Sequence, residues 1–262
     1  MFKNLSKTNL KITFLGTGTS QGIPVIGCGC AICHSSDQRD KRLRVSVMIA
    51  IADTTIVIDS GPDFRYQMLR ENVMDLDAIL YTHEHKDHIA GLDDIRPFNY
   101  ILKKHIDIYA TLRVQEALKR EFAYIFSDVK YHGLPLINLY TVGEEPFEVK
   151  GNTVIPIDVM HYKLPIKGYR IGDFTYITDA KTIDEKSFEK IKGSKVLVIN
   201  ALQKEDHISH FTLSEAIEFA NKVGAETTYF THMSHNLGLH ADIEKELPAH
   251  IRLAYDGLSF QV

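Results

Sequence analysis

The most concentrated chemistry in this sequence lies in the stretch 82–88, T-H-E-H-K-D-H, which directly follows the apolar run 76–81. Imidazole is the commonest nitrogen ligand for borderline divalent cations, and a carboxylate adds a harder oxygen donor. The apolar run reads as a buried strand, so the polar residues emerge on a loop at its carboxyl end. We predict that this loop binds metal through its three histidines and its aspartate: His83, His85, Asp87 and His88.

Further donors follow other segments that the sequence predicts to be extended. His161 comes shortly after one strand predicted over 148–159, Asp179 follows the strand 174–178, and His232 follows 228–231. A lone histidine or aspartate at a strand end is more often a structural residue, so the residue types alone leave these roles open. Alternation also predicts a first strand over 10–15 and a hairpin over 45–52 and 55–58, and helical periodicity marks 64–71 and 114–126.

All cysteines of the chain fall in one short segment, as Cys28, Cys30 and Cys33. Three cysteines cannot all pair within the chain, and a reducing compartment disfavours disulfides. Structural zinc is normally tetrahedral with thiolate and imidazole ligands, so this segment predicts a zinc site that is completed by one more donor, most simply a histidine. The alternatives are a redox-active cluster or three unligated thiols.

The pattern His83-x-His85-x-Asp87-His88 resembles the signature of the metallo-β-lactamase fold superfamily of metal-dependent hydrolases. This resemblance implies an α/β fold, a four-layer αβ/βα sandwich of two mixed sheets with the metals at one edge. The glycine-rich segment 16–22 and the cysteine motif after it resemble one branch more narrowly, the phosphoribosyl 1,2-cyclic phosphate phosphodiesterases of the carbon-phosphorus lyase pathway.

The resemblance also implies roles for individual residues. One catalytic ion would be held by His83, His85 and His161. The other would be held by Asp87, His88 and His232, with Asp179 bridging the two ions. A structural zinc would be held by Cys28, Cys30, Cys33 and His235. Asp59 would brace the metal loop through hydrogen bonds, and His210 would be the general acid, oriented by Asp87. His207 is the alternative acid, and His240 receives no role.

These assignments predict a metal-dependent phosphodiesterase. Two ions, manganese or zinc, would supply a bridging hydroxide that attacks a small phosphodiester, most simply a cyclic one. Hydrolysis of a thioester or lactone on the same centre is one alternative. A tRNA-processing nuclease is another, but no Gly- and Pro-rich segment for an RNA-binding arm is found.

The whole chain is compatible with one domain over 1–262, carrying a zinc-binding insert near 27–34, and its hydrophobic content of 44% can furnish a sizeable core. The net charge of −4 gives no global basic field for duplex nucleic acid or an anionic membrane. The N-terminus lacks an apolar signal core, and no run approaches the length of a membrane span. We therefore expect a cytoplasmic enzyme with a small-molecule substrate, and a homodimer by resemblance to related enzymes.

Overall fold

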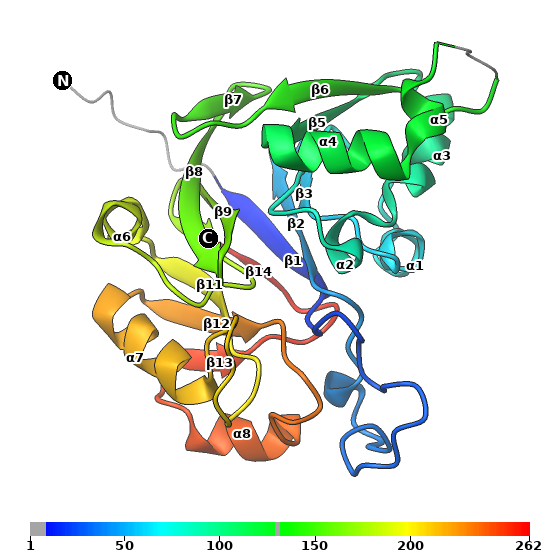
Figure 1. The fold of residues 1–262 in the computed structure, drawn as a ribbon. Coiled ribbons are helices and arrows are strands. Elements are labelled where there is room, and N and C mark those ends of the chain that lie inside the picture. Colours follow the sequence, from blue (N-terminus) through cyan, green and yellow to red (C-terminus); the bar gives the residue numbers. More distant parts are fainter. Residues whose placement is uncertain (1–8, 129–131) are drawn as a thin grey trace.

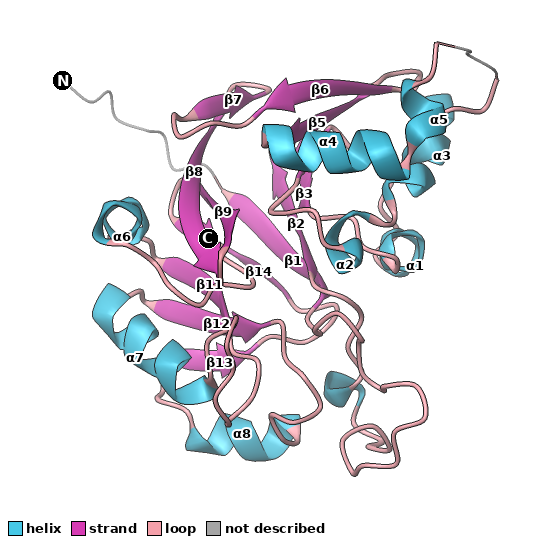
Figure 2. Cartoon of the chain, viewed as in Figure 1, coloured by secondary structure: helices cyan, strands magenta, loops and turns pink. Residues whose placement is uncertain are grey.

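The computed structural model describes residues 9–128 and 132–262. Within these residues two mixed seven-stranded sheets pack face to face, and helices cover the outer surface of each sheet (Figure 1 and Figure 2). The α/β four-layer sandwich that the sequence predicts is confirmed. Each described helix is too short or too polar to cross a membrane.

The first sheet has the order β14-β1-β2-β3-β4-β5-β6. Its strands in chain order are β1 (Leu10–Gly16), β2 (Ser46–Ile51), β3 (Thr54–Ile58), β4 (Ala78–Leu80), β5 (Ile106–Ala110), β6 (Ile137–Thr141) and β14 (Ser259–Gln261). The strands β14 to β3 pair antiparallel and β3 to β6 pair parallel. The parallel half sends the carboxyl ends of β3 and β4 to the same edge of the sheet.

The second sheet has the order β13-β12-β11-β10-β9-β8-β7. Its strands are β7 (Phe147–Val149), β8 (Asn152–His161), β9 (Leu164–Ile171), β10 (Phe174–Tyr176), β11 (Val196–Asn200), β12 (Thr227–Thr231) and β13 (Ile251–Leu253). Here β10 to β13 are parallel, so the loops that follow β10, β11 and β12 leave from one edge.

Helices close both outer faces. On the first sheet they are α1 (Phe64–Arg70), α2 (Lys86–Ile89), α3 (Arg96–Leu102), α4 (Leu112–Glu121) and α5 (Ala123–Phe126), with the 3-10 turn η2 (Leu92–Ile95). A second 3-10 turn, η1 (Gln38–Asp40), lies in the segment between β1 and β2. On the second sheet they are α6 (Glu185–Ile191), α7 (Leu213–Val223) and α8 (His240–Glu246). Alternation sorts the strand side chains: Ile56 and Ile58 enter the core between the sheets, whereas Val57 packs under the helices.

Local signals and structure differ in two places. The strand predicted over 148–159 is a hairpin of β7 and β8, because Lys150 and Gly151 take positive φ angles of 48° and 81° and turn the chain. The helical segment 114–126 is divided between α4 and α5 at Phe122, whose φ and ψ of −119° and 43° are not helical. The capping box of Thr212 and Glu215 is present at the start of α7.

Candidate metal centre

The histidines and aspartates of the predicted metal centre come from strand ends of both sheets. The loop after β4 supplies His83 and His85, and the short helix α2 supplies Asp87 and His88. Residues from the second sheet follow: His161 ends β8, Asp179 lies three residues past β10, and His232 directly follows β12. The structure brings all seven into two groups whose ligand atoms lie within 4.8 Å of one another, His83–His85–His161 and Asp87–His88–Asp179–His232.

Asp179 lies between the two groups. Its Oδ2 is 3.2 Å from His232 Nε2 and 3.6 Å from His88 Nε2 in one group, and 3.9 Å from His83 Nε2 in the other. The His83 Nε2 and His85 Nδ1 atoms are 3.0 Å apart. A single carboxylate oxygen thus faces nitrogens of both groups, as a bridging ligand requires.

Hydrogen bonds fix which imidazole nitrogens can act as ligands. Asp59 Oδ2 accepts from His88 Nδ1 at 2.7 Å, and Asp59 also accepts from the backbone N–H and the hydroxyl of Thr82 at 2.8 Å each. The carbonyl of Ser209 accepts from His161 Nδ1 at 2.9 Å, which leaves Nε2 of His161 as the free nitrogen. Such outer contacts orient metal-ligating histidines and raise their basicity, and they give Asp59 the position that the sequence analysis expected.

The donor set fits divalent metal. The Nε2 atoms of His88 and His232 are buried and have no hydrogen-bond partner, an arrangement that is costly unless something else satisfies them. Burial opposes ionisation of Asp179, yet His232 and His88 hold its pKa well below the ordinary value. Burial also opposes a charge on His88, yet Asp87, Asp179 and Asp59 raise its pKa well above the ordinary value. The buried carboxylates are therefore ionised and need nearby positive charge to offset their own, which divalent ions would supply.

Backbone hydrogen bonds lock the loops that carry these residues. Phe211 N donates to Ala180 O at 2.9 Å, Leu202 N donates to Phe211 O at 3.0 Å, and Ser234 N donates to Leu202 O at 2.9 Å. The side chain of Asn200, at the end of β11, accepts from Ala180 N at 2.7 Å and donates to Ala180 O at 3.0 Å. Asn200 is a positioning residue that the sequence analysis missed, although a polar residue ending the apolar run 196–199 was a signal for it.

His210 lies against the metal groups, but its neighbours differ from those expected. Its Nε2 is 3.3 Å from Asp179 Oδ2, and its Nδ1 is 3.1 Å from His207 Nδ1. Asp87, expected to orient His210, lies instead 3.2 Å from His88 Nε2 and 3.8 Å from His232 Nε2. His210 thus comes from the loop before α7 and lies beside Asp179, and the orientation of His210 by Asp87 stays a prediction.

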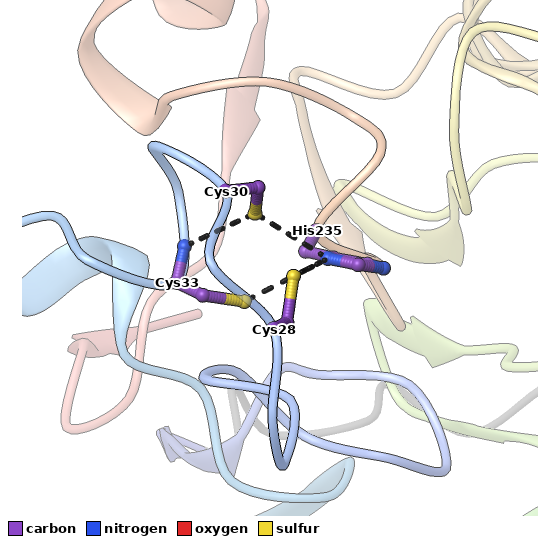
Figure 3. A group of neighbouring side chains, drawn as sticks. All are labelled: Cys28, Cys30, Cys33 and His235. Carbon is purple, nitrogen blue, oxygen red and sulfur yellow. Dashed lines mark hydrogen bonds between the residues drawn. The ribbon is translucent and has the colours of Figure 1, made fainter.

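The cysteine segment forms a second site with His235. The Sγ atoms of Cys28, Cys30 and Cys33 lie 3.3, 3.5 and 3.6 Å from His235 Nδ1 (Figure 3). Ligands at roughly 2.3 Å (sulfur) and 2.0 Å (nitrogen) from a tetrahedral zinc stand about 3.5 Å apart. The backbone N–H of Cys33, then His235, lowers the pKa of the Cys30 thiol to about 6, which favours the thiolate that binds metal. The four residues fit one zinc ion, and the single loop 232–235 reaches both sites.

Comparisons with known proteins agree with this geometry. Residues 54–233 match the model of the β-lactamase superfamily domain. The chain is 41% identical to a new diphosphatase from the PhnP family, with a TM-score of 0.91 over 97% of this chain and 98% of that chain. It is 18% identical to zinc-bound PqqB from Methylobacterium extorquens, with a TM-score of 0.78 over 96% of this chain and 100% of that chain, which supports the fold.

A longer relative aligns with almost the whole length of this chain. The chain is 40% identical over 252 residues to an octanoyltransferase from Porphyromonas gingivalis, a match that covers 95% of this chain and 51% of that protein. The chain thus spans about half the length of this relative. The family match covers more than half of the chain, and the likeness to the PhnP family agrees with the branch that the cysteine motif indicates. The chain therefore belongs to the β-lactamase superfamily and has the fold of its metal-dependent hydrolases.

Proposed function

We propose that this chain is a metal-dependent phosphodiesterase that hydrolyses a small, most simply cyclic, phosphodiester. The observation that carries the proposal is the position of Asp179, whose single oxygen Oδ2 faces both ligand groups and His210. Two divalent ions held there would supply Lewis acidity, lowering the pKa of water and offsetting negative charge on the phosphoryl oxygens. The similarity to a diphosphatase of the PhnP family supports phosphoryl chemistry.

The residues of the chain would divide the work as follows. Five histidines and two aspartates would hold the ions: His83, His85, His161, His88, His232, Asp87 and Asp179. Asp59 would hold the His88 ring in place, and the carbonyl of Ser209 would do the same for His161. His210 would donate a proton to the departing oxygen. Cys28, Cys30, Cys33 and His235 would hold a structural zinc away from the reacting atoms.

A panel of substrates tests this proposal. The metal content of the purified protein is measured, and hydrolysis of bis(p-nitrophenyl) phosphate and of a five-membered cyclic phosphodiester is followed with and without added Mn²⁺. We expect about three metal ions per chain, two catalytic and one structural, and turnover of both diesters. Three ions without turnover of either diester would contradict the phosphodiesterase and leave the metal sites standing.

A second candidate is hydrolysis of an acyl thioester, and one observation favours it. The relative from Porphyromonas gingivalis is an octanoyltransferase, so acyl chemistry occurs in a protein that contains a similar sequence. An octanoyl thioester therefore belongs in the same panel. An apolar cavity of about 490 Å³ does exist, but its lining includes His105 before β5 and Ile137 at the start of β6. These are the amino ends of parallel strands, opposite to the edge that carries the metal residues, so this cavity is badly placed to hold the acyl chain of a substrate at the metals.

The role of His210 yields a separate prediction. Burial lowers the pKa of His210 to about 4, so the free ring is neutral near pH 7, and the negative charge of a bound phosphodiester would raise this pKa and favour uptake of a proton from water. We expect His210→Gln to lower kcat by about 10²- to 10³-fold for a diester with an alkoxide leaving group, and far less for p-nitrophenolate, which departs without a proton. His207→Gln is the matched control, because His207 is more exposed and contacts His210 on its outer side.

The same variant separates two roles. His161, Asp179 and His210 also form a group whose ligand atoms lie within 4.8 Å, so His210 could instead be a metal ligand. A loss of metal from His210→Gln, with equal losses of rate for both leaving groups, would contradict the general acid.

A further inference from the structure

One short segment joins the two metal sites. His232 belongs to the group that contains Asp179, and His235 belongs to the cysteine site. Only Met233 and Ser234 separate them. Figure 3 shows His235 pointing at the three cysteines from this segment. A displacement of the segment would therefore change the ligand geometry of both sites at once.

The glycine-rich loop after β1 holds this segment. Met233 N donates to Thr17 O at 3.0 Å, and Thr19 N donates to Met233 O at 3.1 Å. His232 has a φ of 54°, an unfavourable conformation for a residue with a Cβ, and it persists only where neighbouring contacts enforce it. The two hydrogen bonds to Met233 supply such contacts immediately beside it.

The same loop has no free amide at Gly18 or Thr19 for a phosphate. Gly18 N donates to Leu43 O at 2.8 Å, and Thr19 N is used by Met233. A Cβ on Gly18 would lie 3.0 Å from both Cβ and O of Arg42, so this glycine permits the close approach of two chain segments. Gly18 therefore serves as a packing position.

The side chain of Arg42 holds the loop 17–19 in place through hydrogen bonds. It is 4% exposed, and its Nη1 donates to Thr17 Oγ1 at 2.8 Å and to Ala254 O at 2.7 Å. Its Nη2 lies 3.1 Å from His240 Nδ1, and because a guanidinium can only donate, the His240 Nδ1 atom is the acceptor. Burial, reinforced by Arg42, lowers the pKa of His240 to about 4, so this ring is neutral.

Hydrogen bonds from His240 and Ser35 to Asp40 link Arg42 to the cysteine segment. The backbone N–H of His240 donates to Asp40 Oδ1 at 2.8 Å, and Ser35 Oγ donates to Asp40 Oδ2 at 2.6 Å. Ser35 follows Cys33 by two residues, and its N–H donates to Ile32 O within the cysteine segment. Among the described residues, His240 is in none of the candidate metal groups. Its place is that of an acceptor for Arg42.

We propose that Arg42 is a positioning residue that, by fixing the Thr17–Thr19 loop against Met233, couples metal binding at the cysteine site to metal binding at the Asp179 site. This inference rests on the metal sites of the proposed function. Because such coupling is reciprocal, zinc at the cysteine site strengthens binding at the Asp179 site, and the reverse holds equally.

The test measures metal affinity in folded protein and not turnover. Chelator-treated protein is titrated with Mn²⁺, with the cysteine site either loaded with Zn²⁺ or empty, and Co²⁺ bound at the cysteine site is followed by its thiolate absorption. We expect Arg42→Met to weaken Mn²⁺ binding by about 10- to 100-fold, the usual effect of losing a residue that orients ligands. We also expect wild-type protein to bind Mn²⁺ more tightly when the cysteine site is loaded.

Arg170→Met is the matched control. Arg170 also ties backbone carbonyls through its guanidinium, donating to Lys190 O at 2.9 Å and to Lys192 O at 2.7 Å. It lies six residues along β9 from Leu164, which pairs with His161, and it belongs to none of the candidate metal groups among the described residues. We expect a similar drop in Tm with unchanged Mn²⁺ and Co²⁺ affinity.

Two outcomes would overturn the inference: an Arg42→Met protein that loses Tm but keeps both affinities, or wild-type Mn²⁺ affinity that is independent of the cysteine site. If Arg42→Met does not fold, Thr17→Val decides, because it keeps the shape but removes the hydroxyl that accepts from Arg42 and donates to Asp256 Oδ1. Thr17→Ser should then restore the Mn²⁺ affinity, and equal affinities in Thr17→Val and wild type would contradict the coupling. Coupled binding without hydrolysis of any diester would overturn the proposed function and leave this inference intact.

Discussion

Asp179→Asn is expected to lower kcat by at least about 10³-fold, because it removes the charge that a bridging ligand must carry while keeping the shape of the side chain. Asparagine is suitable here because Asp179 has a φ of 57°, a conformation that asparagine tolerates better than alanine. Oδ2 of Asp179 lies within 3.9 Å of nitrogens of His83, His88, His210 and His232, so no other carboxylate in this arrangement can take its place. Steady-state kinetics together with metal analysis measures the effect.

The control for this variant lies at the other end of the same strand. Asp173 directly precedes β10, its side chain is 44% exposed, and it forms an ion pair with Lys195. Asp173→Asn should therefore leave turnover and metal content unchanged, since exposed pairs contribute little. If Asp179→Asn kept the rate and the metal content of the wild type, Asp179 would not bridge the ions, and the proposed function would lose its main support.

Cys30→Ser is the second variant for which we expect a large effect, and this effect falls on stability. The three sulfurs converge on His235 Nδ1, and removing one of them leaves an incomplete tetrahedron. We expect the loss of about one zinc per chain and a lower free energy of unfolding, by about 3 kcal/mol or more, which corresponds to a drop in Tm of roughly 6–12 °C. Metal analysis and a thermal unfolding scan check both.

His34→Gln is the comparison for Cys30→Ser. His34 is exposed and lies in the same segment, and its ring contacts the carbonyl of Cys30 without joining the four residues of the site. Its replacement should change neither zinc content nor Tm. Unchanged zinc and Tm in Cys30→Ser would contradict a structural zinc site and would favour unligated thiols.

Much of the site was readable from the sequence because its donors are close in the chain. His83, His85, Asp87 and His88 lie within six residues, so any loop that turns inward at the end of β4 keeps them together. The cysteine motif is similarly local. The distant donors His161, Asp179 and His232 could be placed only by resemblance, since a single polar residue at a strand end is common.

The residues that sequence reasoning missed share a different property. Each makes a hydrogen bond that involves a backbone group and joins segments remote in the chain. The side chain of Asn200 bonds the backbone of Ala180, and that of Arg42 bonds the carbonyl of Ala254. The backbone N–H of His240 donates to the carboxylate of Asp40. No spacing rule in the sequence relates such partners. The same reason applies to the neighbours of His210, because which carboxylate lies beside its ring depends on which loops the two sheets bring together.

The sequence by itself determined the donor types, their local spacing and the alternation that divides each strand between core and helix layer, because these depend on covalent distance and on the period of the strand. The tertiary structure alone decided which strand ends meet. The parallel register of β10, β11 and β12 sets Asp179, Asn200 and His232 at one edge, although 53 positions separate the first from the last. Non-local pairing of this kind results from packing the whole core, and no segment of the chain encodes it alone.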